Sequence, residues 1–113
     1  MDILDEYRNH KNEYRINRAL LWDFDYDNFD WQRLKATVIR RVIERGRKED
    51  YFAAFDLYGG REGFREGIKE VSSLSDKDMN FVCIIFDLKK EELTCYKKKM
   101  ARQRLLKQWS LEP

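Results

Sequence analysis

Apolar side chains recur every three to four residues along most of the chain, which is the period of an amphipathic helix. The most regular stretch begins at Trp31, directly after a predicted N-cap at Asp30, and carries a broad apolar face over residues 31–43. Gly46 stands where a left-handed C-cap is expected. We therefore predict a helix from Trp31 to Arg45.

Two shorter helices are predicted next, at residues 49–58 and 61–71, separated by the glycine pair at 59–60. Gly63 and Gly67 lie on the second of them, where small residues allow a close helix contact. This pair has the length of a helix-turn-helix. Its second helix, however, alternates basic and acidic residues, and a net-neutral face is poorly suited to binding phosphates.

Ser75, with Asp78 three residues later, forms a variant of the capping box and predicts the start of another helix. The run 81–86 within it is apolar enough to be a buried strand instead. The cap and the helical neighbours favour a helix, and the sequence leaves both alternatives open.

The two ends of the chain are less regular. Residues 4–20 form a helical pattern with only a thin apolar stripe. In the last predicted helix, residues 89–109, the apolar face changes side near Met100. Either the helix breaks there, or its distal half packs on a second surface such as another molecule.

Taken together, these elements predict an all-α fold, a compact bundle of five to six short helices in a single domain. We expect an N-terminal helical extension over residues 1–20, a core helical domain over residues 21–96 and a basic C-terminal helix over residues 97–113. The only proline is the last residue, and no β-branched residues alternate with polar ones.

Residues 22–31 combine five aromatic side chains with four aspartates. The aromatics, Trp22 among them, are too many to leave in water and are expected to enter the core. The aspartates must stay solvated or paired.

Charge is segregated along the chain. Residues 1–31 carry eight acids against four bases, and residues 32–48 carry one acid against seven bases. Residues 49–96 are again acidic, with eleven acids against six bases, whereas residues 97–109 carry six bases and no acid. Such blocks indicate either internal pairing or basic surfaces offered to an acidic partner.

The residues needed for common catalysis are scarce. His10 is the only histidine, and the two cysteines lie twelve residues apart without metal-binding spacing. No phosphate-binding glycine loop is present. We predict that the protein is not an enzyme, with no catalytic residues, no metal and no cofactor.

The aspartates at 23, 25 and 27 resemble the start of a calcium loop, but Asn28 and Leu34 stand where that loop needs glycine and glutamate. A carboxylate-only magnesium enzyme is therefore the last-ranked alternative.

Binding to a macromolecule is the function that remains. One set of residues is expected to form a structural motif that spans the acidic turn and the basic helix after it: Trp22, Asp23, Asp30, Trp31, Arg41 and Gly46. The candidate binding residues are Arg40, Arg41, Arg45, Arg47, Lys97, Lys98, Arg102, Arg104 and Trp109. The partner is expected to be a protein, with DNA or RNA as the alternative and a homodimer through the C-terminal helix as a further one.

No apolar run is long enough to cross a membrane, and the first fourteen residues are too charged for a signal peptide. We therefore expect a cytoplasmic protein whose cysteines are reduced.

The segment from Leu21 to Asp23, the pair Asp30-Trp31 and the pattern Ile39-x-Arg41-Val42-x-x-x-Gly46 recur in this order, followed by Tyr58-Gly59 and Asn80-Phe81. Over residues 20–96 the chain resembles a family of small uncharacterised bacterial proteins of the Bacteroidetes type.

The resemblance implies an antitoxin or accessory role beside nucleotidyltransferase toxins of the abortive-infection type, and it brings no catalytic residues. From the residues themselves, an ion pair between Asp23 and Arg41 would fix the acidic loop against the basic helix.

Overall fold

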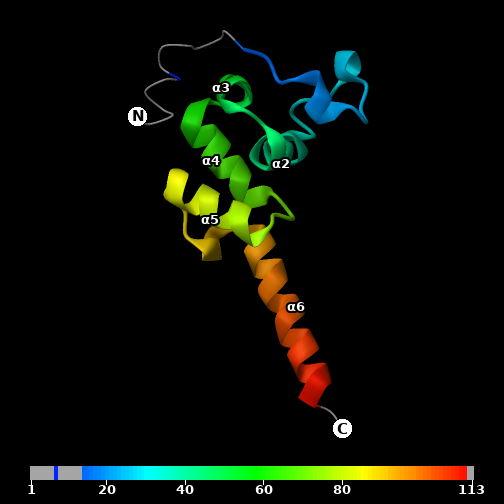
Figure 1. Ribbon diagram of the computed structural model, residues 1–113, viewed down its shortest axis with the longest axis vertical. Helices are drawn as coiled ribbons and strands as arrows, with labels where there is room; N and C mark the ends of the chain where they lie inside the picture. Colours follow the sequence, from blue (N-terminus) through cyan, green and yellow to red (C-terminus); the bar gives the residue numbers. More distant parts are fainter. Residues whose placement is uncertain (1–6, 8–13, 112–113) are drawn as a thin grey trace.

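The computed structural model describes Tyr7 and residues 14–111, and every regular element in this part of the chain is helical (Figure 1), which confirms the predicted all-α class. In chain order the elements are the 3-10 turns η1 (Arg18–Leu21) and η2 (Tyr26–Asn28), the helices α2 (Lys35–Arg45), α3 (Lys48–Leu57), α4 (Gly60–Glu70) and α5 (Asp76–Ile85), the 3-10 turn η3 (Lys90–Glu92) and the helix α6 (Thr94–Leu111).

Helices α2, α3 and α4 pack on one another and form the centre of the bundle, and α5 contacts α2. The core between them is rich in aromatic rings. Phe55 and Phe64 meet edge to face with their centroids 5.2 Å apart, and Phe86 of the α5 end lies 5.3 Å from Phe64. All three side chains are fully buried. Such aromatic pairs stabilise a core beyond the area that they bury.

The close contact between α2 and α4 depends on Gly67. A Cβ atom at this position would lie 2.2 Å from Cδ1 of Ile39 on α2, so only glycine allows this distance. At Gly63, a Cβ atom would lie 1.5 Å from the carbonyl oxygen of Tyr58. The predicted close helix contact is confirmed at Gly67, whereas Gly63 instead makes room for the turn directly before α4.

The ambiguous run 81–86 is helical, with its first residues in the middle of α5. Ser75 begins this helix as predicted, because its Oγ accepts a hydrogen bond of 3.1 Å from the backbone N–H of Asp78. Met79 and Val82 face the core.

The predicted start of α2 is wrong, whereas its predicted end at Arg45 is confirmed. The α-helix begins at Lys35 rather than Trp31, because Asp30 caps a separate turn by accepting from the backbone N–H of Arg33 at 3.1 Å. Gly46 has φ −73° and ψ 154°, which is extended rather than left-handed. Glycine is still needed there, since a Cβ atom would lie 2.5 Å from the carbonyl oxygen of Val42.

The predicted N-terminal helix over residues 4–20 does not reach Leu20. Apart from Tyr7, residues 4–13 lie outside the described part of the chain. Residues 14–17 are irregular, and only the short turn η1 follows, with Asn17 accepting a hydrogen bond from the N–H of Ala19. The thin apolar stripe explains this, because a helix without a face to bury gains little from packing.

Helix α6 leaves the bundle and extends away from it as a single straight element (Figure 1). The molecule measures 59 × 34 × 19 Å, and its radius of gyration is 16.1 Å. A compact chain of this length would have about 13 Å. The distal half of α6 therefore lies outside the bundle, and its surface is available for contacts with other molecules.

Candidate functional site

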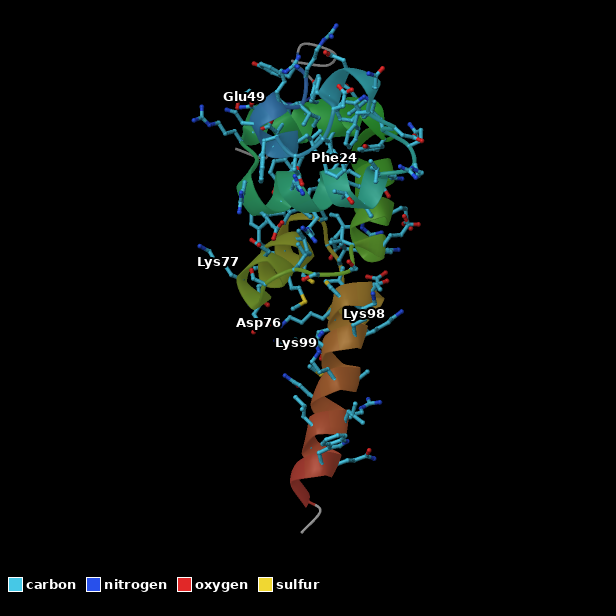
Figure 2. All side chains as sticks on the ribbon, turned by 90° about the vertical axis from the view of Figure 1, so that its right-hand side faces the viewer. Phe24, Glu49, Asp76, Lys77, Lys98 and Lys99 are labelled. Carbon is cyan, nitrogen blue, oxygen red and sulfur yellow. The ribbon has the colours of Figure 1, made fainter. Side chains whose placement is uncertain are left out.

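The first turns of α6 are anchored in the bundle. Leu93 and Cys95 are buried beside α4, and Tyr96 packs against the same core. Lys99 forms an ion pair with Asp76 at the start of α5. The hydrogen bond from Lys99 lowers the pKa of the Asp76 carboxyl, so this pair holds α6 to α5 over the neutral range. Figure 2 shows the two side chains at the junction.

Beyond Met100 the helix continues without a break, and every residue from 101 to 109 is exposed. The alternative of a break near Met100 is therefore wrong, since the helix continues where its apolar face changes side. Leu105 is 55% exposed, Leu106 60% and Trp109 73%. Positions four apart on a helix share a side, so Leu105 and Trp109 form one apolar strip with Leu106 next to it.

Cations surround this strip. Lys97, Lys98, Arg102 and Arg104 are all exposed, and none of them forms an ion pair with a carboxylate in the part of the chain that the structure describes. Figure 2 shows side chains leaving the distal half of α6 on all sides with no other element beside it. We call residues 101–109 the arm.

The basic helix α2, in contrast, uses its central arginine internally. Nη2 of Arg41 donates to Oδ2 of Asp23 at 2.8 Å, and Nη1 donates to the other carboxylate oxygen and to the carbonyl oxygen of Leu20 at 3.0 Å. The hydrogen bond from Arg41 lowers the pKa of Asp23 and raises that of Arg41 itself. The ion pair expected from the motif is present.

The other arginines of this region differ in how free they are. Arg40 lies 3.2 Å from Glu44 one turn later on the same helix. Arg45 and Arg47 are exposed, and no ion pair links either of them to a carboxylate among the described residues. Of the four candidate binding arginines here, two are engaged and two face solvent.

Trp22 does not enter the core as predicted, because its side chain is 76% exposed. Leu21, the last residue of η1, takes the buried position, and Trp22 follows it as the C-cap of this turn with its side chain in solvent. Arg41 holds the residues on both sides of the ring, at Leu20 and Asp23. Trp22 and the arginines of α2 border a hollow of ≈ 230 Å³.

The other aromatics of this region pack against the core as expected, but they are only half-buried. Trp31 packs on the rings of Tyr26 and Phe29, with centroids 5.4 Å and 4.7 Å away. Its carbonyl oxygen accepts a hydrogen bond of 2.9 Å from the hydroxyl of Tyr58, the C-cap residue of α3. Trp31 is therefore a structural residue, in agreement with its place in the motif.

The aspartates of the acidic turn are each engaged separately. Asp25 accepts from Nδ2 of Asn28 at 2.8 Å, and Asp27 lies 3.6 Å from Arg18. Within the described ranges, no three histidine, cysteine or acidic side chains come together in a way that could hold a metal ion. His10 lies outside these ranges.

Two arginines that the sequence analysis did not single out hold the end of α5. Nε of Arg65 donates to the carbonyl oxygen of Phe86 at 2.8 Å, and Nη2 donates to that of Asp87 at 2.8 Å. Arg61, one turn earlier, approaches the carbonyl oxygen of Ile85 at 3.5 Å. In a helix-turn-helix, these arginines would have to face the DNA groove. Here they bind backbone carbonyl groups of the same chain, which argues against that alternative.

Asp50 is a further residue that sequence reasoning missed. It is only 5% exposed and accepts 2.9 Å hydrogen bonds from the backbone N–H groups of Asn17 and Arg47. It therefore ties residues 14–17 to the start of α3. Its position at the beginning of a predicted helix was the available signal, because acids there often cap backbone N–H groups.

The thiols are poorly suited to nucleophilic chemistry. Cys95 is buried and Cys83 is half-buried, and both are free. Burial raises the pKa of each thiol, whereas a reactive cysteine needs a lowered one.

None of the helices in the described ranges is both long enough and apolar enough to cross a membrane. The arm is too rich in cations, and the apolar α5 is too short.

Residues 16–68 match the model of a family of unknown function, DUF6922. The match covers the acidic turn, α2, α3 and most of α4, and so includes the Arg41–Asp23 pair and the close contact at Gly67. It leaves α5 and α6 outside. No curated protein and no solved structure matches the chain.

Proposed function

We propose that this protein is a non-enzymatic protein-binding module and that the arm is its docking element. The observation that carries the proposal is the exposure of Leu105, Leu106 and Trp109 on a helix that leaves the bundle and whose only charges between residues 97 and 109 are positive. An amphipathic helix of this kind docks in an apolar groove bordered by acids.

A protein explains this surface better than nucleic acid does. Phosphates attract the cations but leave two leucines uncovered, and burial of apolar surface is the main gain in protein association. Trp and Arg are the residues most often found at the energetic centre of protein interfaces. The internal use of Arg41 and the pairing of Arg40 with Glu44 also weaken the alternative of a continuous basic face for nucleic acid.

We further propose an antitoxin-like role toward a nucleotidyltransferase toxin. The support is the resemblance of residues 20–96 to the bacterial family described above, together with the basic charge of the arm, which suits an acidic surface. The proposed localisation is the cytoplasm, where such a toxin would act.

The arm is tested by photo-crosslinking in the native cells. A photoreactive amino acid replaces Leu105 in the tagged full chain, and a matched chain carries it at Glu66, which is exposed on α4. We expect a crosslink to protein from position 105 only, and we expect Trp109→Asp to abolish it. The absence of a crosslink from position 105 would overturn the proposal. A crosslink that nuclease removes and that depends on Arg45 and Arg47 would overturn it in favour of nucleic acid.

The toxin assignment has its own test. A nucleotidyltransferase encoded beside the gene is expressed with and without this protein. Restored growth with the wild-type chain, and not with the Trp109→Asp chain, is the expected result. Growth arrest that the wild-type chain leaves unchanged removes the antitoxin role and leaves the docking role of the arm standing.

A further inference from the structure

A second apolar surface lies on α5, outside the residues that the sequence analysis assigned to binding. Phe81 is 40% exposed, Ile84 79% and Ile85 38%, although α5 buries Met79 and Val82 on its other side. Three large apolar side chains within five residues form a patch of the kind that marks an interaction site. We call these three residues the α5 face.

No described element of the same chain covers the α5 face. The ring of Tyr51 touches Phe81 from the side, with centroids 6.4 Å apart, and leaves the isoleucines open. The arm cannot fold back to reach it, because α6 is continuous from Thr94 to Leu111 and points away from the bundle (Figure 1). Among the described residues, the α5 face is therefore left open to solvent.

We propose that the arm of one chain docks on the α5 face of a second copy and that the second copy returns the same contact. This inference rests on the proposed docking role of the arm and names its occupant. One chain carries both members of the pair, so a two-fold arrangement covers both apolar surfaces of each copy at once and closes the assembly.

Charge complementarity favours this pairing over the alternatives. The arm and the turn before it carry six bases and no acid, whereas the segment 49–96 that contains the α5 face carries eleven acids against six bases. Asp78 is one of these acids and lies on α5 itself, where its charge contributes to the raised pKa of Tyr51. Opposite charges on the two surfaces fix the orientation of an interface.

The same charges argue against a dimer in which the two arms pair with each other. Two helices that bear only positive charges between residues 97 and 109 would bring like charges together along their length. The homodimer through the C-terminal helix that the sequence suggested therefore becomes an exchange of arms, in which each helix meets the surface formed by the acidic segment 49–96.

The test is the molar mass of the full chain by light scattering over a wide concentration range. We expect the wild type to be a dimer, and we expect Ile84→Asp and Trp109→Asp each to weaken it by about tenfold or more, because each places a charge in an apolar contact. The matched control is Trp22→Asp, which changes an equally exposed tryptophan outside both surfaces and leaves the dimer intact.

Mixing the two weakened variants separates this arrangement from any other. One intact arm remains on the Ile84→Asp chain and one intact α5 face remains on the Trp109→Asp chain, so the mixture forms a heterodimer more readily than either variant forms a homodimer. Circular dichroism checks that each variant is folded.

A wild type that is monomeric at every concentration, or a dimer that Ile84→Asp does not weaken, overturns the inference. Either result leaves the proposed function standing if position 105 still crosslinks to a different protein, so the two failures can be told apart.

Discussion

Arg41 and Asp23, eighteen residues apart, join the acidic turn to the basic helix through two parallel hydrogen bonds between the guanidinium and the carboxylate. The same guanidinium also donates to the carbonyl oxygen of Leu20. Only arginine can serve three acceptors in this fork geometry, whereas lysine acts as a single point charge. The pair therefore positions the turn that leaves Trp22 in solvent.

Replacement of Arg41 by alanine should lower the free energy of unfolding by about 1–3 kcal/mol, because charge-assisted hydrogen bonds and a carbonyl partner are lost. Arg41→Lys should recover only part of this loss. Urea unfolding measures the difference, and Arg45→Ala on the exposed side of the same helix is the control. An unchanged midpoint for Arg41→Ala would show that the pair is only a surface contact.

The pair also predicts an acid dependence. Arg41 lowers the pKa of Asp23 in the folded state, so its contribution is present above pH 3.8, the ordinary value, and is lost as the pH falls through the lowered folded value. The difference in stability between wild type and Asp23→Asn should therefore shrink below pH 3.8. A difference that stays constant down to the acid transition would contradict this linkage.

Gly67 predicts a packing effect with a matched rescue. Gly67→Ala places a methyl group against Cδ1 of Ile39, which is fully buried, and should cost about 1–3 kcal/mol by overpacking. Ile39→Val removes the clashing atom, so the double variant should be more stable than Gly67→Ala alone. Two losses that simply add would mean that the two side chains do not meet.

The elements of this fold were predictable where local pattern and packing agree. The buried faces of α2 and α4 follow the helical period, and α4 buries Phe64 and Ile68 in the core. The cap at Ser75 favoured the helix that the structure shows, although the sequence left the strand open, because a side-chain acceptor at a helix start is a local signal.

The errors came from tertiary contacts that no local pattern contains. Trp22 was expected in the core on composition alone, but the core place in that turn belongs to Leu21. The α5 face could not be predicted either, since the apolar run 81–86 looks like core on all sides. Its exposure depends on which neighbours α5 finds.

Of the candidate site, the cations and Trp109 of the arm were predicted as exposed binding residues, and they are exposed. The roles of Arg61 and Arg65 at the end of α5 were missed, because a hydrogen bond to a backbone carbonyl more than twenty residues away leaves no mark in the sequence.

The left-handed helix end that the sequence placed at Gly46 is found instead at Gly59 after α3 and at Asp87 after α5. Asp87 has φ 52°, and the N–H of Leu88 after it donates to the carbonyl oxygen of Cys83 at 3.0 Å, as in a Schellman motif. Asp87→Gly should raise the free energy of unfolding by about 0.5–1 kcal/mol, because glycine adopts this conformation without strain.

A β-branched residue at the same place should act in the opposite direction. Asp87→Val keeps the backbone hydrogen bonds available but opposes the positive φ, so thermal unfolding should occur at a lower temperature than in the wild type. Equal melting temperatures for Asp87→Gly and Asp87→Val would show that this backbone conformation carries no strain.

The buried tyrosines predict a loss of stability in alkali. Burial, with the hydrogen bond to Asp56, raises the pKa of Tyr7 to about 12, and burial also raises the pKa of Tyr51 and Tyr58. A raised folded value means that the unfolded chain loses the proton first. The stability is therefore complete below pH 10 and falls as the pH rises from 10 toward the folded values.

In a spectroscopic titration, the phenols of Tyr7, Tyr51 and Tyr58 should form a late group that ionises only as the protein unfolds. Tyr7→Phe removes one member of the late group and also frees the carboxylate of Asp56 from this donor. Compared with the wild type, this variant should therefore lose a smaller part of its neutral-pH stability as the pH rises above 10. A single titration step for all six tyrosines at pH 10 would contradict the burial of these rings.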